Sequence, residues 1–167
     1  MKPRINLKNA EPRIFKAMAY AEKELADFSL DPKLKELIKI RVSQLNGCGY
    51  CINMHSKESR ALGETEQRLY ALAAWWETPF FTDAEQAALK LAEEVTNISD
   101  KGLSETAYQK ALGLFGEQGV AQLIFTTVTI NGWNRIAISS QKVPEPDEQV
   151  SKKKHLEMST PDRLSWI

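Results

Sequence analysis

Apolar residues recur along this chain with the spacing of amphipathic helices. The clearest stripe has apolar positions three or four residues apart, a period near 3.6: Leu34, Leu37, Ile38, Val42 and Leu45. Asp31-Pro32 precedes the stripe, and an N-capping residue followed by proline is a typical helix start. Asn46-Gly47 follows it. A helix is therefore predicted between these two signals.

Similar start and stop signals predict further helices on both sides. Glu11-Pro12 opens a helix before the first one. After it, a helix from about Cys48 to Leu62 ends at Gly63, Thr65 caps the next helix, and the capping box Thr82–Glu85 begins another. Ser104 caps a short helix that ends at Gly116. Residues 119–140 are apolar and rich in β-branched side chains, which by propensity alone would allow a strand. We predict a buried helix there, because the segment is long and has no second strand to pair with. The expected fold class is all-α, a compact multi-helix domain.

The chain length and the position of the helix signals predict one domain and a tail. A chain of 167 residues suits a single domain with its own core. All helix signals fall within residues 1–143. Residues 144–167 begin with Pro144-Glu145-Pro146-Asp147, continue with three lysines and contain few apolar residues before Trp166. We expect this tail to be mobile or to order on a neighbouring subunit.

The charge balance bears on the partners. Lys plus Arg and Asp plus Glu both number 22, so the formal net charge is zero. Nucleic acids and anionic membrane surfaces favour a basic excess, and neither is expected as a partner. No stretch approaches the about 20 apolar residues of a membrane helix, and no apolar run of signal-peptide length follows Met1-Lys2-Pro3-Arg4. We expect a cytoplasmic protein.

The two cysteines of the chain lie three residues apart, in Cys48-Gly49-Tyr50-Cys51. In a reducing compartment such a pair is more typical of a redox or metal site than of a structural disulfide. Residues three apart on a helix share a face, with Cβ atoms about 5–6 Å apart, close enough for a disulfide after modest adjustment. His55 lies one turn further on the same face. A helix start at this point would also stabilise a thiolate.

A lowered thiol pKa supplies only part of such chemistry. Lowering it by about two units from about 8.5 raises the thiolate fraction at pH 7 roughly 25-fold. The accompanying loss of nucleophilicity takes back roughly eightfold. A positioned proton donor contributes more, about 10²–10⁴ in rate. His55 and a nearby carboxylate are the candidates for this role.

The cysteine pair allows other interpretations. Free cysteines pack like small apolar residues, so the pair could be purely structural. Zinc could take Cys48, Cys51 and His55, with Glu36 as a fourth ligand. Structural zinc sites usually draw ligands from two separated pairs, however, and the chain has no second Cys-x-x-Cys. Haem attachment is excluded, because it needs a histidine directly after the second cysteine and Ile52 occupies that position.

The whole stretch from Glu36 to His55 closely resembles the core motif of the carboxymuconolactone decarboxylase family, in its alkylhydroperoxidase D-like branch. Residues 75–81 and Asn131-Gly132-Trp133-Asn134-Arg135 also resemble this family, and the resemblance covers most of residues 10–143. It implies an all-helical homo-oligomer, often a trimer or hexamer. It further implies a peroxidase without metal or organic cofactor. A small hydroperoxide oxidises one cysteine, the other closes a disulfide, and a dithiol or lipoyl-type protein reductant reopens it.

The resemblance also implies roles for individual residues. A glutamate, two cysteines and a histidine form a proton relay, and these fall on Glu36, Cys48, Cys51 and His55. Cys51 would be the attacking thiol and Cys48 the resolving one. Tyr50 completes the candidate site; it stands where the best-studied branch has a second histidine, which bears on peroxidase efficiency. Two other functions stay open: a lactone decarboxylase like the family's namesake, and a non-enzymatic redox-sensing oligomer.

Overall fold

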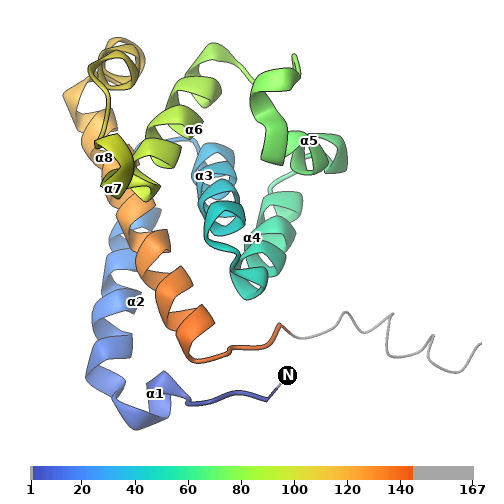
Figure 1. Cartoon of the computed structure of the whole chain (residues 1–167), viewed down its shortest axis with the longest axis vertical. Coiled ribbons are helices and arrows are strands. Elements are labelled where there is room, and N and C mark those ends of the chain that lie inside the picture. The colour runs from blue at the N-terminus through green and yellow to red at the C-terminus, as the bar shows by residue number, and fades with distance from the viewer. Residues whose placement is uncertain (1, 145–167) are drawn as a thin grey trace, which may run out of the picture.

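The computed structural model describes residues 2–144, and within that range it contains helices, turns and connecting segments but no strand (Figure 1). The elements are α1 (Leu7–Ala10), α2 (Pro12–Ala26), α3 (Pro32–Asn46), α4 (Gly49–Ala61), α5 (Glu66–Ala71), the 3₁₀ helix η1 (Leu72–Glu77), α6 (Asp83–Thr96), α7 (Ile98–Lys101) and α8 (Glu105–Ser139). The predicted all-α class is confirmed. The tail predicted at residues 144–167 lies outside the described residues, except for Pro144. None of the described helices is both long and apolar enough to cross a bilayer.

Local sequence signals set the ends of α3, the central helix. The Asp31 side chain accepts hydrogen bonds from the backbone N–H groups of Lys33 and Leu34, at 2.8 and 3.1 Å. Pro32 occupies the first helical position, where its missing N–H costs nothing. Gly47 ends the helix in the left-handed region, at φ +70°, which a glycine adopts without strain. The chain then turns directly into α4.

The long helix α8 joins two segments that the sequence predicted as separate helices. Gly116 interrupts it with φ +65° and ψ 177°, so the element consists of two helical parts around a kink. The β-branched segment is helical, as predicted. Thr126 and Thr127 donate their hydroxyl protons to the carbonyls of Gln122 and Leu123, one turn back, at 2.7 and 2.9 Å. These bonds satisfy buried hydroxyl groups without a partner strand.

The one-turn helices α1 and α7 were not predicted. Each has four residues and contributes no buried side chain, so neither could show an apolar stripe. The position of α1 nonetheless matters for the site. It lies at the same end of the molecule as the end of α8 (Figure 1), where the Arg4 N–H donates to the Ser140 carbonyl at 2.9 Å. Residues 4–10 thereby lie next to the end of α8.

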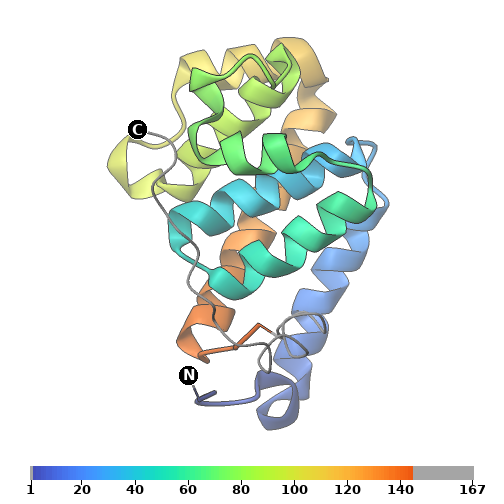
Figure 2. The ribbon, with the colours of Figure 1, turned by 90° about the vertical axis from the view of Figure 1, so that its right-hand side faces the viewer.

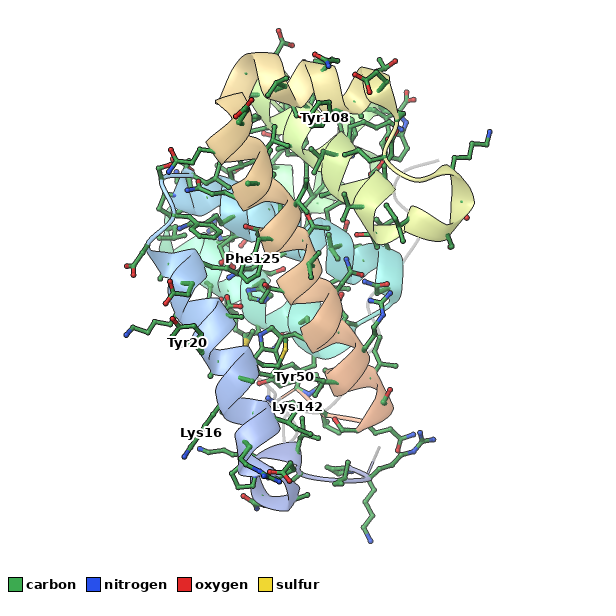
Figure 3. All side chains as sticks on the ribbon, turned by 90° about the vertical axis from the view of Figure 1, so that its left-hand side faces the viewer. Lys16, Tyr20, Tyr50, Tyr108, Phe125 and Lys142 are labelled. Atoms are coloured by element: carbon green, nitrogen blue, oxygen red, sulfur yellow. The ribbon has the colours of Figure 1, made fainter. Side chains whose placement is uncertain are left out.

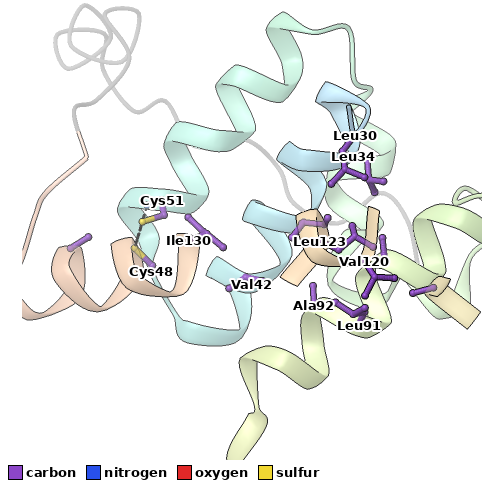
Figure 4. Close-up of a cluster of buried hydrophobic side chains, with 14 residues drawn as sticks. Leu30, Leu34, Val42, Cys48, Cys51, Leu91, Ala92, Val120, Leu123 and Ile130 are labelled. Atoms are coloured by element: carbon purple, nitrogen blue, oxygen red, sulfur yellow. Dashed lines mark hydrogen bonds between the residues drawn. The ribbon is translucent and has the colours of Figure 1, made fainter. Parts of the chain in front are cut away.

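The core is built around α3, which packs against α4, α6 and α8; Figure 2 shows α3 and α4 side by side. On one side of α3 the buried cluster includes Ile38, Val42, Leu91, Leu123 and Ile130, and it extends to Cys48 and Cys51 (Figure 4). On the other side Leu37 and Ile40 pack with Leu72, Trp75, Phe81 and Leu89. The cysteine pair is thus part of the core, at the start of α4 and next to α8.

Candidate active site

The two cysteine sulfurs lie together at the N-terminus of α4, as their spacing predicted. Cys48 is the N-cap residue, and the helix begins at Gly49, one residue later than the predicted start. The Sγ atoms are 2.6 Å apart, and Cys48 Sγ accepts the backbone N–H of Cys51 at 3.4 Å. Both side chains are buried, with 1% and 2% of their surface exposed. The pair is therefore placed to exchange a proton or to form a bond.

The two thiols have opposite pKa shifts. The pKa of Cys48 is lowered to about 6, first by the hydrogen bond from Cys51; the Cys51 N–H, the charge of His55 and Asn134 add to this against the effect of burial. The pKa of Cys51 is raised by its hydrogen bond to Cys48, by burial and by the Cys48 charge, while Asn134 and Lys142 partly oppose the shift. In the reduced pair, Cys48 therefore carries the thiolate and Cys51 the proton.

His55, one turn after Cys51, is held between two carboxylates. Its Nδ1 lies 2.8 Å from Glu36 Oε2 on α3 and 2.9 Å from Glu58 Oε2 on α4. The opposite oxygen of Glu36 is 3.3 Å from Lys39 Nζ, and Lys39 also pairs with Glu22 of α2. Glu36, Lys39 and His55 are all buried. The result is a chain of alternating charges that links α2, α3 and α4.

These pairings outweigh burial in setting the protonation states. Burial would lower the pKa of His55, but the hydrogen bonds to Glu36 and Glu58 raise it. Burial would raise the pKa of Glu36, but the hydrogen bond and charge of His55, together with Lys39, lower it. Burial would lower the pKa of Lys39, which its two carboxylate partners raise. Glu36 is thus ionised, and His55 retains its proton to higher pH than an ordinary histidine.

A cavity of about 540 Å³ adjoins the cysteine pair. Cys51 and His55 line its wall, whereas Cys48 does not. Tyr50, the remaining candidate from the sequence, also lines it, and Lys142 Nζ lies 4.0 Å from the centre of the Tyr50 ring. In Figure 3 Tyr50 and Lys142 lie together, in the space between α2 and α8. The structure therefore brings all five candidate residues to one region, four of them on α4 or at its cap.

Several residues of this region were missed by sequence reasoning. Asn134 of α8 is fully buried and hydrogen-bonds to Ser43 Oγ and to Asn46, each at 2.9 Å. It belongs to a segment that carried the family resemblance, but nothing local connects it to cysteines more than 80 residues away. The sequence does contain a signal for Lys39 and Glu58. Lys39 follows Glu36 by three residues and Glu58 follows His55 by three residues, so each shares a helical face with a candidate residue.

The zinc alternative does not match the geometry. Among residues 2–144, the side chains whose possible metal-binding atoms converge are Glu36, His55 and Glu58, with those atoms within 4.8 Å of one another. Neither cysteine sulfur is part of that group. Glu36 is moreover neutralised already by Lys39. The carboxylates serve as hydrogen-bond partners of His55, and the sulfurs as partners of each other.

Known proteins resemble this chain in sequence and in fold. Residues 12–94 match the model of the carboxymuconolactone decarboxylase family. The uncharacterized protein YdfG of Bacillus subtilis is 40% identical over 139 residues, which cover 83% of this chain and 95% of YdfG. A crystal structure from Agrobacterium tumefaciens, of a protein of unknown function proposed to be the antioxidant defence protein AhpD, is 34% identical. It aligns with a TM-score of 0.85 over 87% of this chain and 100% of that one.

A more distant structure shows the extent of the shared fold. The alkylhydroperoxidase AhpD core of a peroxidase-related protein from Ralstonia eutropha is 20% identical and has a TM-score of 0.75, covering 84% of this chain and 75% of that chain. The chain belongs to the carboxymuconolactone decarboxylase family. Its fold is that of the AhpD-like proteins, as the sequence motif predicted.

Proposed function

We propose that this protein is a thiol-dependent peroxidase, a cytoplasmic disulfide oxidoreductase that reduces small organic hydroperoxides. The observation that carries the proposal is the pair of buried sulfurs 2.6 Å apart, beside a cavity that also receives His55. The proposed antioxidant role of the Agrobacterium relative supports it. A homo-oligomer, trimer or hexamer, and a dithiol or lipoyl-type protein reductant complete the proposal. The chemistry needs no metal or organic cofactor.

Oxidation begins at Cys51, the cysteine that lines the cavity. The Cys51 proton passes to the Cys48 thiolate across the short Sγ–Sγ contact. The Cys51 thiolate then attacks one peroxide oxygen, so that an S–O bond forms and the O–O bond breaks. The departing alkoxide takes a proton from His55 and leaves as the alcohol ROH. This step leaves a sulfenic acid on Cys51 and a neutral His55.

The second step closes the disulfide. Cys48 attacks the sulfenic sulfur, the S–S bond forms, and the hydroxyl group leaves with the Cys48 proton as water. Glu36 acts as a positioning residue, because its hydrogen bond holds the His55 ring and favours the charged form. Tyr50 forms cavity wall next to Cys51. A dithiol reductant then returns two electrons and two protons to the pair.

Single-cysteine variants under turnover conditions test the proposal. Wild-type protein is mixed with cumene hydroperoxide and dihydrolipoamide, and alcohol formation is followed. Without dihydrolipoamide, the Cys48→Ser variant is expected to form one sulfenic acid per chain and stop, because no resolving thiol is present. It should form this acid more slowly than the wild type, because the Cys48 thiolate that accepts the Cys51 proton is missing. The Cys51→Ser variant is expected to consume no peroxide through the cavity. Full multiple turnover by both variants would contradict the proposal, as would peroxide consumption that is unaffected by alkylation of both cysteines.

A further inference from the structure

The cavity is much larger than hydrogen peroxide requires. At about 540 Å³ it lies within the range of about 300–1,000 Å³ that is typical of sites for organic ligands. Much of its wall is apolar and comes from three helices: Phe15 of α2, Met54 of α4, and Trp133 and Ile136 of α8. Phe15 and Trp133 also contact each other edge to face, with ring centres 5.7 Å apart. A substrate with an apolar body fits this lining.

The charged residues of the wall differ in whether they have a partner. Glu22 is paired with Lys39, and Glu58 with His55, so both carboxylates already have a partner within the protein. Lys8 and Lys142 instead contact aromatic rings, with their Nζ atoms 5.7 Å from the centre of Phe15 and 4.0 Å from that of Tyr50. Neither lysine has a carboxylate partner among residues 2–144. Within the described part of the chain, two cations of this cavity are therefore left without a carboxylate.

Position separates Lys142 from the carboxylate Glu58. Lys8 and Lys142 are exposed and yet line the cavity, which places them at its mouth. Tyr50, beneath Lys142, is in the first turn of α4, and Glu58 is eight residues further along. At about 1.5 Å per residue these positions are about 12 Å apart along the helix axis. Cys51 lies beside Tyr50. An anionic group near Lys142 can thus avoid the carboxylate end while the rest of the ligand reaches the sulfur.

We propose that the cavity selects organic hydroperoxides that join an apolar body to an anionic group, with that group at Lys142 and Lys8 and the peroxide at Cys51. This inference rests on the proposed peroxidase function and specifies its substrate class. The ring beneath each ammonium fixes the position of the charge without neutralising it. A carboxylate at the mouth would form a partly exposed ion pair, which corresponds to a gain of about two- to fivefold in affinity.

The test compares a fatty-acid hydroperoxide with its methyl ester, which has the same apolar body and no charge. Reduced protein is mixed with each compound below its micelle concentration and without reductant, and free thiols are counted over time. Omitting the reductant confines the measurement to the oxidation step. Because Lys142 also acts on the pKa of Cys51, the quantity compared between variants is the ratio of the acid rate constant to the ester rate constant.

The expected result is a wild-type ratio above one that falls about two- to fivefold in Lys142→Gln, falls further when Lys8→Gln is added, and survives in Lys142→Arg. Lys16→Gln is the matched control, because Lys16 is an exposed lysine of α2 that points away from the cavity (Figure 3); its ratio should equal that of the wild type. Equal rates for acid and ester in the wild type, or a ratio unchanged in Lys142→Gln, would overturn the inference.

A second readout separates this inference from the proposed function. Dodecanoate and dodecanol contain no peroxide, and each is tested for slowing the alkylation of the cysteines by iodoacetamide. Protection by dodecanoate alone, lost in Lys142→Gln, supports the charged cavity even if no hydroperoxide oxidises the cysteines. Equal protection by both compounds overturns it, even if the peroxidase activity is real.

Discussion

At the residue scale, the proposed chemistry depends on a proton that is shared unequally between two sulfurs. Cys48 caps α4 and its sulfur accepts the backbone N–H of Cys51. The hydrogen bond between the two thiols lowers the pKa of Cys48 and raises that of Cys51. The thiolate at rest is therefore on the cysteine outside the cavity. In the proposed mechanism, proton transfer across the short sulfur–sulfur contact moves the thiolate to Cys51, the cysteine that lines the cavity.

The thiolate of Cys48 should be measurable directly. Thiolate absorbance in the ultraviolet, followed against pH in the reduced protein, is expected to rise around pH 6, because the Cys48 pKa is lowered to about 6. The Cys51→Ala variant loses the hydrogen bond that contributes most to the shift, so its transition should move to higher pH. A single wild-type transition near pH 8.5, the value of an ordinary thiol, would contradict this assignment.

The pH profile of peroxide oxidation should have two limbs. The rate is expected to rise as the cysteine pair ionises around pH 6 and to fall at higher pH, as His55 loses its proton through its raised pKa. In Glu36→Gln the falling limb should move to lower pH, because the partner that stabilises protonated His55 is neutral, and the maximal rate should drop by roughly tenfold or more. Glu58→Gln should shift the limb less, since the Glu58 side chain is 53% exposed. An unchanged Glu36→Gln profile with native helicity would show that the relay is misassigned.

At the element scale, Lys39 connects two helices through its ion pairs. It is buried and pairs with Glu36 on its own helix and with Glu22 on α2. Lys39→Met would leave the carboxylates without their cation and is expected to lower the unfolding free energy by about 2–4 kcal/mol. The matched control Lys90→Met breaks a surface pair with Glu94 and should cost less than about 1 kcal/mol. Denaturant unfolding measures both, and equal losses would show that the Lys39 pairs contribute nothing special.

The kink of α8 gives a second test at this scale. Gly116 has φ +65° and ψ 177°, a conformation nearly restricted to glycine, so Gly116→Ala is expected to destabilise the protein by about 1–3 kcal/mol. Gly113 lies three residues earlier in helical conformation, with no atom within 4 Å of an added Cβ. Gly113→Ala should stabilise by about 0.5–1 kcal/mol. Thermal unfolding distinguishes a stabilising substitution from a destabilising one. Stabilisation by both substitutions would show that position 116 does not need the backbone conformation of glycine.

At the scale of the whole molecule, sequence signals predict the features that depend on neighbouring residues and miss the contacts between residues far apart in the chain. Asp31 and Gly47 fix the ends of α3 by their own capping geometry, and the spacing of Cys48 and Cys51 suffices to bring their sulfurs together. Asn134 and Lys142 reach the site only because α8 packs against α3 and α4. Such contacts depend on how the helices cross, which hydrophobic period and capping signals do not encode.

Assembly is the remaining prediction at this scale. A trimer or hexamer is expected from the family resemblance, and the apolar side chains of Phe125 and Val128 are exposed on α8, 40% and 53% respectively. Light scattering coupled to size exclusion should give one mass, a multiple of the chain mass, under reducing and oxidising conditions. A mass that changes with oxidation, without peroxide turnover, would favour the redox-sensing alternative.

The central claim is that the two sulfurs form one redox unit, and one stoichiometric experiment tests it most directly. Reduced protein is treated with one equivalent of an organic hydroperoxide, and intact mass, free thiols and cysteine-containing peptides are then determined. We expect loss of both thiols, a mass lower by two hydrogens and a Cys48–Cys51 linkage within one chain, with one alcohol formed per chain. Two free thiols after exposure to excess hydroperoxide would contradict it.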